Sequence, residues 1–512
     1  MHNSRPAVTG SQYSAPVADE AYIELSEEAA RALAAADARA SAAGPGAPRI
    51  AIVGAGIAGL TAAFILAGRG VACTVYEAAE RVGGRMHTGP AGYWEDGQTS
   101  EWCGELVDTG HLAIRALAKR FGLELIDMHA AEPEGTTETF HFGGGHYSGA
   151  EAAADFTAVR GRLAEDLEAA GEMDWSGDAA AGLELDAMSV ADWIDSRVPG
   201  GRGSRLGALL DAGYRAECAA DTADQSALNI VYALGAQPDA EGFALLGESD
   251  ERFRVAGGVA QIPEAIAAGL PAPVELGHRL EAVAARSDGS VELVLDAAGA
   301  RREVVADHVL LALPFAVLRT VDCEKARFDA RKRAAIDELG AGSSAKVTLQ
   351  FRERHWNAHG GTGTAATGGC ATTWEATRGQ PGATGILVAY EGGTEAAALA
   401  AGAPFADARD DAGVAESART ILDRLEPVFP GIAERWNGRA AVSAPMLDPL
   451  KRCSYPYYRV GQYHRFGGNE GVRSGNIHFA GDHCSELQGF MEGAATEGYR
   501  AAREILAAIG AG

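Results

Sequence analysis

Three glycines and a glutamate near the amino-terminal end have the types and spacing that bind a dinucleotide. Gly54, Gly56 and Gly59 form a G-x-G-x-x-G string between an apolar run and a helix-forming segment. In this context the first glycine permits a tight turn, the second admits a pyrophosphate, and the third lets helix and strand pack closely. Glu77 ends the next apolar run, where a carboxylate accepts hydrogen bonds from ribose hydroxyls. The pattern predicts a nucleotide site, with an unliganded glycine-rich turn as the alternative.

The string that continues from Glu77 indicates which nucleotide is bound. It reads EAAERVGGRMHT and contains Gly83, Gly84 and Arg85. It resembles the second signature of the flavin-containing amine oxidase family, in which a glycine pair and an arginine lie beside the pyrophosphate. Nicotinamide dehydrogenases lack this string. The resemblance therefore implies FAD, and a surface turn with solvated arginines is the alternative.

Two further strings extend the resemblance over about residues 49–508. SEWCGELVDTG is similar to the family segment that places small residues near the flavin, and NIHFAGDHCSELQGFMEGAATEGYRAAREIL matches the closing signature. The last helix would point its N-terminus at the flavin ring, where its dipole stabilises negative charge. The additional FAD contacts that the resemblance implies are Gly104, Glu105, Leu106, Gly481, Asp482, Phe490 and Met491.

The family comprises monoamine oxidases, polyamine oxidases and L-amino-acid oxidases, so the resemblance also implies a reaction. A hydride leaves the carbon that bears a neutral amine, and water hydrolyses the resulting imine. The reduced flavin then passes its electrons to O2, which yields hydrogen peroxide. The flavin supplies this chemistry while the protein supplies orientation and polarity, so no catalytic triad is expected.

Lys346 is the first candidate catalytic residue. The string SSAKVTLQF is similar to the family strand that carries an active-site lysine, which in relatives holds a water near flavin N5 and assists the reaction with oxygen. Apolar neighbours on both sides favour a half-buried strand, where an unpaired lysine would be costly. An ordinary exposed strand lysine is the alternative.

Tyr455 and Phe490 are candidates for an aromatic pair that holds the amine over the flavin. RCSYPYYRVG resembles a family string whose first tyrosine corresponds to Tyr455, and Phe490 takes the second aromatic position. Two aromatic faces select an amine by shape and by quadrupole. Some relatives attach FAD to a cysteine in this string, but Ser454 stands at that place and Cys453 is one residue early. The expected FAD is therefore non-covalent.

The substrate class depends on a missing arginine. L-Amino-acid oxidases of the family pair the substrate carboxylate with an arginine in a G-x-M-R string, whereas this chain has Gly104-Glu105-Leu106-Val107. This favours an amine without an α-carboxylate. If an arginine from elsewhere in the chain binds the carboxylate, the protein is instead an L-amino-acid oxidase, which is the alternative. A specialised biosynthetic enzyme, a desaturase and a non-catalytic flavoprotein are further alternatives. Glu105 would pair either a cationic substrate or another protein side chain.

The amino-acid composition limits the classes of molecule that the protein is expected to bind. The chain has 512 residues and a net charge of -26, from 44 Lys plus Arg against 70 Asp plus Glu. Nucleic acids and anionic membranes need a basic surface, so neither is expected. Seven scattered cysteines form no Cys-x-x-Cys pair, which argues against a zinc site or a disulfide framework and favours the cytoplasm. The expected partners are a small amine or amino acid and O2, with a homodimer as one alternative for the assembly.

These residues require an α/β fold with two interlocked domains. We expect a Rossmann-like FAD-binding domain built from discontinuous segments, and a substrate domain with a mixed sheet and a helical part. A helix over 19–43 should follow disordered residues 1–18. The predicted boundaries are 1–48 for an N-terminal extension, 49–125, 250–310 and 465–512 for the FAD-binding domain, and 126–249 and 311–464 for the substrate-binding domain.

Several elements are predicted inside these segments. Residues 150–247 read as mostly helical, and a long helix should cover 489–510. Two β-runs, 290–297 and 307–314, suggest a return to one sheet, and 357–384 reads as turns between strands. His111 and His483 are assigned structural hydrogen bonding rather than general-base roles.

Overall fold

The computed structural model describes residues 20–36, 46–177, 179–237, 242–399 and 402–511. The disorder predicted for residues 1–18 lies outside this part of the chain. The helix predicted over 19–43 is present as α1 (Glu20–Ala35), and the end of that prediction also lies outside the described residues.

A four-stranded parallel sheet gathers strands from distant parts of the sequence. Its order is β19 (Ile477–Phe479), β10 (His308–Leu311), β1 (Ile50–Val53) and β2 (Thr74–Tyr76), with every neighbouring pair parallel. Every residue of β1 is buried, as expected for a strand that is covered on both faces. The α/β class and the discontinuous origin of this sheet agree with the sequence-based prediction.

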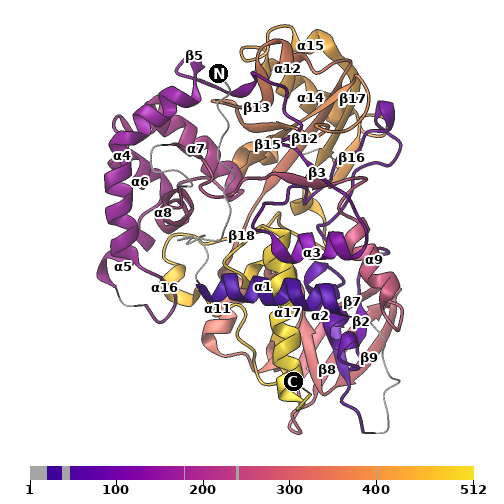
Figure 1. Cartoon of the computed structure of the whole chain (residues 1–512). Coiled ribbons are helices and arrows are strands. Elements are labelled where there is room, and N and C mark those ends of the chain that lie inside the picture. Colours follow the sequence, from indigo (N-terminus) through magenta and orange to yellow (C-terminus); the bar gives the residue numbers. More distant parts are fainter. Residues whose placement is uncertain (1–19, 37–45, 178, 238–241, 400–401, 512) are drawn as a thin grey trace.

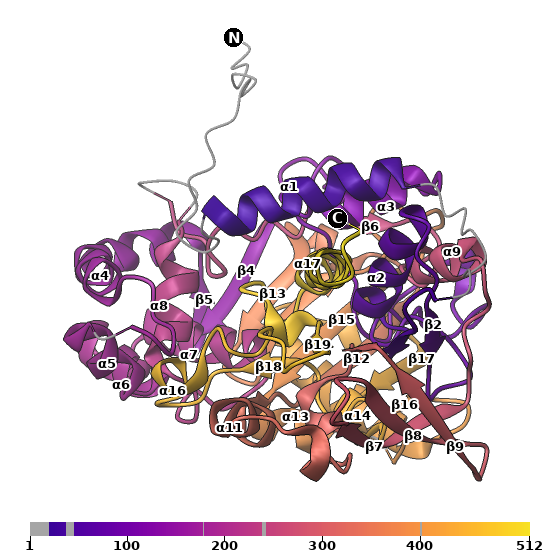
Figure 2. The ribbon, with the colours of Figure 1, turned by 90° about the horizontal axis from the view of Figure 1, so that it is seen from below.

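Two helices meet over this sheet. In α2 (Ile57–Gly68) every residue from the first to Ala67 is buried, which is typical of a helix enclosed on all sides. The C-terminal helix α17 (Met491–Ala508) packs against it, and Figure 2 shows the two side by side, seen nearly end-on. Gly498 permits this approach, because a Cβ there would lie 2.2 Å from the Ala58 carbonyl oxygen. α1 and α3 (Leu112–Arg120) complete the group.

A separate antiparallel sheet corrects one prediction. β7 (His278–Ala285), β8 (Val291–Ala297) and β9 (Ala300–Ala306) form a three-stranded meander at the bottom of Figure 1. The run at 290–297 therefore belongs to this meander, whereas the run at 307–314 supplies β10 of the parallel sheet. The two runs do not share one sheet, because β9 turns back between them.

An eight-stranded sheet forms the upper half of the molecule (Figure 1). All its neighbouring pairs are antiparallel except β13 with β4. The interpretation of 357–384 as turns was wrong, because 361–367 and 370–375 are paired strands. Most residues of both strands are buried, which the Gly, Ala and Thr composition did not indicate. In order the strands are β16 (Phe405–Asp407), β17 (Trp436–Ser443), β12 (Ser344–Phe351), β15 (Gly385–Gly392), β14 (Cys370–Glu375), β13 (Gly361–Thr367), β4 (Thr137–Phe142) and β5 (Gly145–Tyr147).

The described part of 150–247 is mostly helical as far as Gly235, as predicted, whereas residues 242–247 form coil and turn. Its first helix begins at a capping box, in which Ser148 accepts from the backbone of Glu151 and the Glu151 carboxylate accepts in return. α7 ends beside the eight-stranded sheet, so its last residues face the interior between the two halves. The helices are α4 (Gly149–Ala170), α5 (Ala180–Asp186), α6 (Val190–Arg197), α7 (Arg205–Glu217) and α8 (Ala227–Gly235), on the left of Figure 1.

Short elements connect these layers. No helix within the described ranges is both long and apolar enough to cross a membrane. There are also two antiparallel ladders of two strands each, one of β3 (Leu125–Asp127) with β6 (Phe253–Val255) and the other of β11 (Gly340–Ala341) with β18 (Pro456–Tyr457). The remaining helices are α9 (Gln261–Gly269), α10 (Phe315–Leu318), α11 (Ala330–Glu338), α12 (His355–Ala358), α13 (Gly393–Leu399), α14 (Ala412–Leu425), α15 (Ile432–Arg435) and α16 (Tyr463–Phe466).

Candidate active site

One large cavity connects the parallel sheet to the eight-stranded sheet. Its volume is about 940 Å³, within the range of cofactor and ligand sites. It is lined at one end by the glycine turn and at the other by Lys346 and Tyr455. Of the predicted site residues, Gly59 alone does not line it. The sequence signatures, although far apart along the chain, therefore converge on a single space.

The glycine turn has the geometry that a pyrophosphate needs. Gly54 adopts φ +104°, and a Cβ there would lie 2.5 Å from the Ala312 carbonyl oxygen. A Cβ on Gly59 would lie 2.0 Å from the Gly54 carbonyl oxygen, so this residue serves the packing of helix on strand. At Gly56, by contrast, a Cβ would meet nothing within 4 Å. The free approach to Gly56, at the start of α2, fits a phosphate group against a helix N-terminus.

Glu77 lies beside this turn at the end of β2. Its Oε2 accepts a hydrogen bond from the Ala55 backbone N–H at 2.7 Å, and its Oε1 accepts from Ala79 N–H at 2.9 Å. These bonds fix the carboxylate at the cavity wall. Each oxygen keeps a second lone pair, so the arrangement fits acceptance from ribose hydroxyls.

Arg85 is held by the C-terminal signature. Its guanidinium donates to the Ser454 carbonyl oxygen at 2.6 Å and to Asp482 Oδ2 at 2.8 Å, with a second contact to Oδ1. Burial acts to raise the pKa of Asp482, but the charge and hydrogen bonds of Arg85 together with the neighbouring His483 outweigh burial and hold this pKa well below its usual range. The pair joins the first and last signatures of the chain at the cavity wall, a link that sequence reasoning missed.

The N-terminus of α17 opens onto the cavity. Phe490 is its N-cap residue and has no side-chain cap, so the first backbone N–H groups of the helix are free of side-chain partners. A Cβ on Gly104 would lie 3.0 Å from the Met491 sulfur, which explains the small residue at that position. The buried Glu492 accepts from the backbone N–H groups of Ala113 and Ile114 at 2.9 Å and thereby anchors the helix start.

The two histidines singled out by the sequence differ in their surroundings. His111 Nδ1 accepts a hydrogen bond from the Asp108 backbone N–H at 2.9 Å, and its ring meets that of Phe490 edge-on at 5.3 Å. The buried His483 packs on the Phe315 ring at 4.4 Å, and burial lowers its pKa. The predicted structural hydrogen bond is therefore present at His111, whereas neither ring nitrogen of His483 has a hydrogen-bond partner within 3.5 Å among the described residues.

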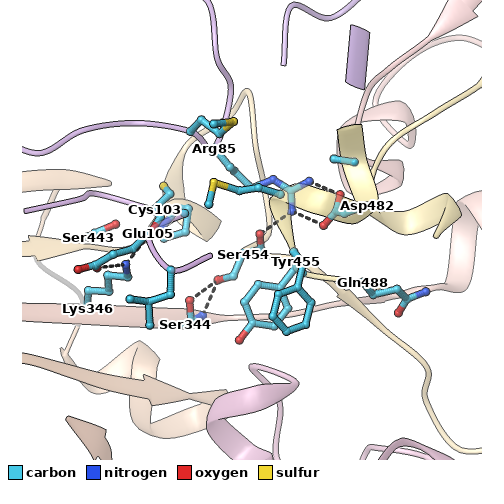
Figure 3. Close-up of a pocket in the computed structure, with 18 of the residues that line it drawn as sticks. Arg85, Cys103, Glu105, Ser344, Lys346, Ser443, Ser454, Tyr455, Asp482 and Gln488 are labelled. Atoms are coloured by element: carbon cyan, nitrogen blue, oxygen red, sulfur yellow. Dashed lines mark hydrogen bonds and ion pairs between the residues drawn. The ribbon is translucent and has the colours of Figure 1, made fainter. Parts of the chain in front are cut away.

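Lys346 extends from β12 into the opposite end of the cavity. Its Nζ donates to Glu105 Oε2 at 3.0 Å and to the Cys103 carbonyl oxygen at 2.5 Å (Figure 3). The ammonium group also lies 5.3 Å from the centre of the Trp374 ring. The salt bridge inside the protein, one of the two alternatives for Glu105, is therefore present. Sequence reasoning did not connect it with Lys346.

Tyr455 and Phe490 both line the cavity. The Tyr455 hydroxyl donates to the Ala216 carbonyl oxygen at 2.7 Å and accepts from the Tyr390 hydroxyl at 2.9 Å. Burial raises the pKa of Tyr455 well above its usual value, so its hydroxyl is neutral at physiological pH. Tyr390 is an aromatic wall residue that no motif indicated.

Cys453 is separated from the cavity that Ser454 lines. The thiol is buried, and burial raises its pKa to about 11, so it is a poor nucleophile at neutral pH. Ser454 accepts hydrogen bonds from the Ser344 backbone N–H and hydroxyl at 2.8 and 2.6 Å. At the position where some relatives attach FAD, the cavity wall therefore contains Ser454 and no cysteine.

Carboxylates gather beyond the aromatic residues, and sequence reasoning did not identify them as site residues. Glu217, the last residue of α7, lines the cavity, and burial together with the negative charge of Asp108 raises its pKa to about 7. Glu251 also lines it, and the surrounding protein and the nearby Asp108 raise its pKa to about 8. Arg378, which lines the same region, donates to Glu132 and to a backbone carbonyl.

A glycine turn with an open phosphate approach, continuous with a cavity that holds a buried lysine and a tyrosine, defines a nucleotide-dependent redox enzyme. Residues 57–506 match the model of the flavin-containing amine oxidoreductase family. The chain belongs to this family, and it is an oxidoreductase that depends on a flavin.

Relatives and solved structures agree with this assignment. The flavin-dependent L-tryptophan oxidase of Lentzea aerocolonigenes is 27% identical, over 90% of this chain and 98% of that protein. The L-amino-acid oxidase of Siganus canaliculatus is 23% identical, over 89% of this chain and 85% of its own. The fold is shared with the cyclohexylamine oxidase of Brevibacterium oxydans (TM-score 0.77, 21% identity, 91% of this chain and 100% of that chain) and with putrescine oxidase bound to putrescine (TM-score 0.75, 22% identity, 90% and 99%).

Proposed function

We propose that this chain binds FAD non-covalently and oxidises an amine that carries no α-carboxylate, with O2 as electron acceptor. The observation that carries the substrate class is the acidic lining of the cavity. Glu217 and Glu251 have no ion-pair partner within the described ranges, whereas Arg378 is paired with Glu132. Above their pKa values of about 7 and 8, where they are ionised, these two carboxylates attract an ammonium group and repel the carboxylate of an amino acid.

The residues that would hold FAD fit its parts. Gly56 and the N-terminus of α2 would take the pyrophosphate, Glu77 the ribose, and the N-terminus of α17 the flavin ring. Non-covalent binding is supported by Ser454, rather than a cysteine, at the wall of the cavity. When bound, FAD supplies hydride acceptance and electron transfer to oxygen.

The side chains around the substrate end orient and protect the amine. Tyr455 is fixed by two hydrogen bonds, so its ring presents a rigid face to the cavity, and Phe490 offers a second apolar surface. Glu217, with a pKa of about 7, would accept the proton that an arriving ammonium must lose before its carbon becomes a hydride donor. Lys346 holds a proton at the position where oxygen reduction generates negative charge.

The second candidate is an L-amino-acid oxidase, which the named relatives favour. The test is anaerobic bleaching of the flavin absorbance by matched pairs such as tryptamine and L-tryptophan, followed by peroxide detection on admitting air. We expect the amine of a pair to bleach the flavin faster than its amino acid. Faster bleaching by the amino acids would overturn the proposed substrate class. Bleaching by neither would point to a specialised biosynthetic substrate.

The proposal also includes the boundaries of the two domains, the cellular location of the protein and its oligomeric state. The FAD-binding domain, 49–125, 250–310 and 465–512, is supported by a parallel sheet whose strands come from or adjoin these three segments. The substrate-binding domain would comprise 126–249 and 311–464. All seven cysteines are free thiols, which supports a cytoplasmic location. A homodimer stays a prediction, which analytical ultracentrifugation would check.

A further inference from the structure

A row of four buried ionisable side chains, alternately basic and acidic, runs inward from the cavity wall, which its first two members line. Lys346 contacts Glu105 at 3.0 Å, and the other Glu105 oxygen lies 3.8 Å from Nη2 of Arg254. Glu101 stands at the far end, where burial raises its pKa to about 7 although the Arg254 charge opposes this. Each of the four side chains belongs to a residue no more than 8% exposed.

The neighbouring carboxylate stabilises the buried charge of Lys346. A buried ammonium without a counter-charge loses its hydration and tends to lose its proton. Glu105 supplies that counter-charge in a charge-assisted hydrogen bond. Burial acts to raise the pKa of Glu105, but Lys346 and Arg254 together outweigh burial and lower this pKa below its usual value. Glu105 is therefore an anion at neutral pH.

The other groups around Lys346 are neutral at that pH. Its partners on the neighbouring strands are Tyr390 of β15 and Ser443 of β17. Burial raises the pKa values of Tyr390 and of the Cys103 thiol. Trp374 of β14 offers only its ring. Among the described residues that touch Lys346, Glu105 is thus the anion.

Two more ionisable groups lie farther away. Arg254 lies beyond Glu105, on β6, and Glu251, whose raised pKa of about 8 leaves it mostly neutral at pH 7, interacts electrostatically with Glu105 when ionised. Neither side chain is hydrogen-bonded or ion-paired to the Lys346 ammonium group in the described part of the chain, so both act on Lys346 by way of the Glu105 carboxylate. The protonation of Lys346 therefore depends first on Glu105.

We propose that Glu105 is a positioning residue that keeps Lys346 protonated and aimed into the cavity, with the charge of Arg254 favouring the ionised form of Glu105. Glu105 thus acts on the oxygen half-reaction without touching the substrate or oxygen. The inference rests on the proposed function for the role of Lys346, whereas the ion pair itself stands on the geometry of this chain.

The first test measures the pair in the protein without substrate or added flavin. Thermal unfolding is compared for Glu105→Gln, Lys346→Met, the double variant, and Glu416→Gln as a control at an exposed carboxylate. Each single variant leaves one buried charge without its partner, so we expect Tm to fall by roughly 5 °C. The double variant removes both charges, so its Tm should fall by no more than the Tm of either single variant. Additive losses would overturn the ion-pair coupling.

The second test follows reoxidation by O2 after dithionite has reduced the flavin, so it needs no substrate. In a plot of the reoxidation rate against pH, we expect the alkaline limb to lie about one pH unit lower in Glu105→Gln than in the parent protein. The limb of Glu105→Asp should lie between those two. In the Lys346→Met background, Glu105→Gln should change the rate no further. An unmoved limb in both Glu105 variants would refute the positioning role.

The two proposals fail in different ways. If no amine or amino acid reduces the flavin while the limb still moves, the proposed function fails and the role of Glu105 stands. If substrates reduce the flavin but the limb stays in place, the role of Glu105 is wrong. Should Glu105→Gln not accumulate as folded protein, Glu105→Asp keeps a carboxylate and supplies the same comparison.

Discussion

Lys346 acts through its position on a fully buried strand. All eight residues of β12 are buried, and the ammonium group emerges at the cavity beside Glu105. A fixed positive charge in such a place stabilises negative charge that develops on oxygen, and it does so without reorganisation. The chemistry expected of this residue therefore belongs to the oxidative half-reaction.

The variant Lys346→Met should slow reoxidation of the reduced flavin about 100-fold and leave its reduction by substrate nearly unchanged. Stopped-flow absorbance of each half-reaction measures the two rates separately. Lys325→Met, at an exposed lysine, is the matched control and should leave both rates intact. Equal slowing of both half-reactions would show that Lys346 serves the general architecture of the cavity.

Glu217 makes substrate affinity depend on pH. Its pKa is raised to about 7 by burial and by Asp108, so the side chain is neutral below that pH and negative above it. The KM for a cationic amine should therefore rise as pH falls through 7. Glu217→Gln should remove this dependence and raise KM about tenfold at pH 8, measured from initial rates. Glu184→Gln, at an exposed carboxylate, is the control; an unchanged pH profile in Glu217→Gln would contradict this role.

At the scale of elements, the approach of α2 and α17 decides whether the cofactor ends of both helices face one cavity. Gly498 lies where α17 crosses the first turn of α2, and its missing side chain leaves room for the Ala58 carbonyl oxygen. The glycine turn precedes α2, and Phe490 precedes α17. Any separation of the helices would move these two ends apart.

We expect Gly498→Ala to lower stability by about 1–3 kcal/mol, because the new methyl group overlaps backbone that has no room to yield. It should also lower the flavin content of the purified protein. Gly161→Ala is a matched control in the exposed part of α4, where a Cβ would meet nothing within 4 Å, and it should stabilise by about 0.5–1 kcal/mol. Denaturant unfolding and flavin absorbance measure both effects. Full flavin content in Gly498→Ala would show that the helices tolerate separation.

For the whole molecule, buried carboxylates set the response of stability to pH. Burial raises the pKa values of Glu101, Glu391 and Glu470 to about 7 each. Between the unfolded value, about 4.3, and 7, the folded protein holds protons that the unfolded chain has released. The free energy of unfolding therefore falls as pH rises across this window.

The melting temperature should accordingly be higher at pH 5.5 than at pH 8, as measured by scanning calorimetry at constant ionic strength. Below about pH 4 the trend reverses, because Asp482 and Glu105, whose pKa values are lowered in the folded state, take up protons. Glu391→Gln, which removes one of the raised groups, should flatten the slope between pH 5.5 and 7. A melting temperature that increases steadily to pH 8 would contradict this assignment.

Much of the site could be predicted because its signals are local. The glycine string, Glu77 and the closing signature act through backbone conformation and helix termini, which depend on neighbours in the sequence. Lys346 was indicated by a strand pattern and Tyr455 by a short string. The parallel strands were apparent from their apolar runs, whereas the Gly-, Ala- and Thr-rich strands at 361–367 and 370–375 carried no such signal.

The sequence by itself determined the family, the flavin and the residues that line one cavity. Only the tertiary structure decided how those residues are paired, Glu105 with Lys346 and Arg85 with Asp482. It also brought Glu217 to the cavity, where no residue that the structure describes forms an ion pair with it. The reason is physical. A carboxylate has the same sequence signature whether it is solvated or buried, and its charge, its pKa and its partner are set by segments that only folding brings together.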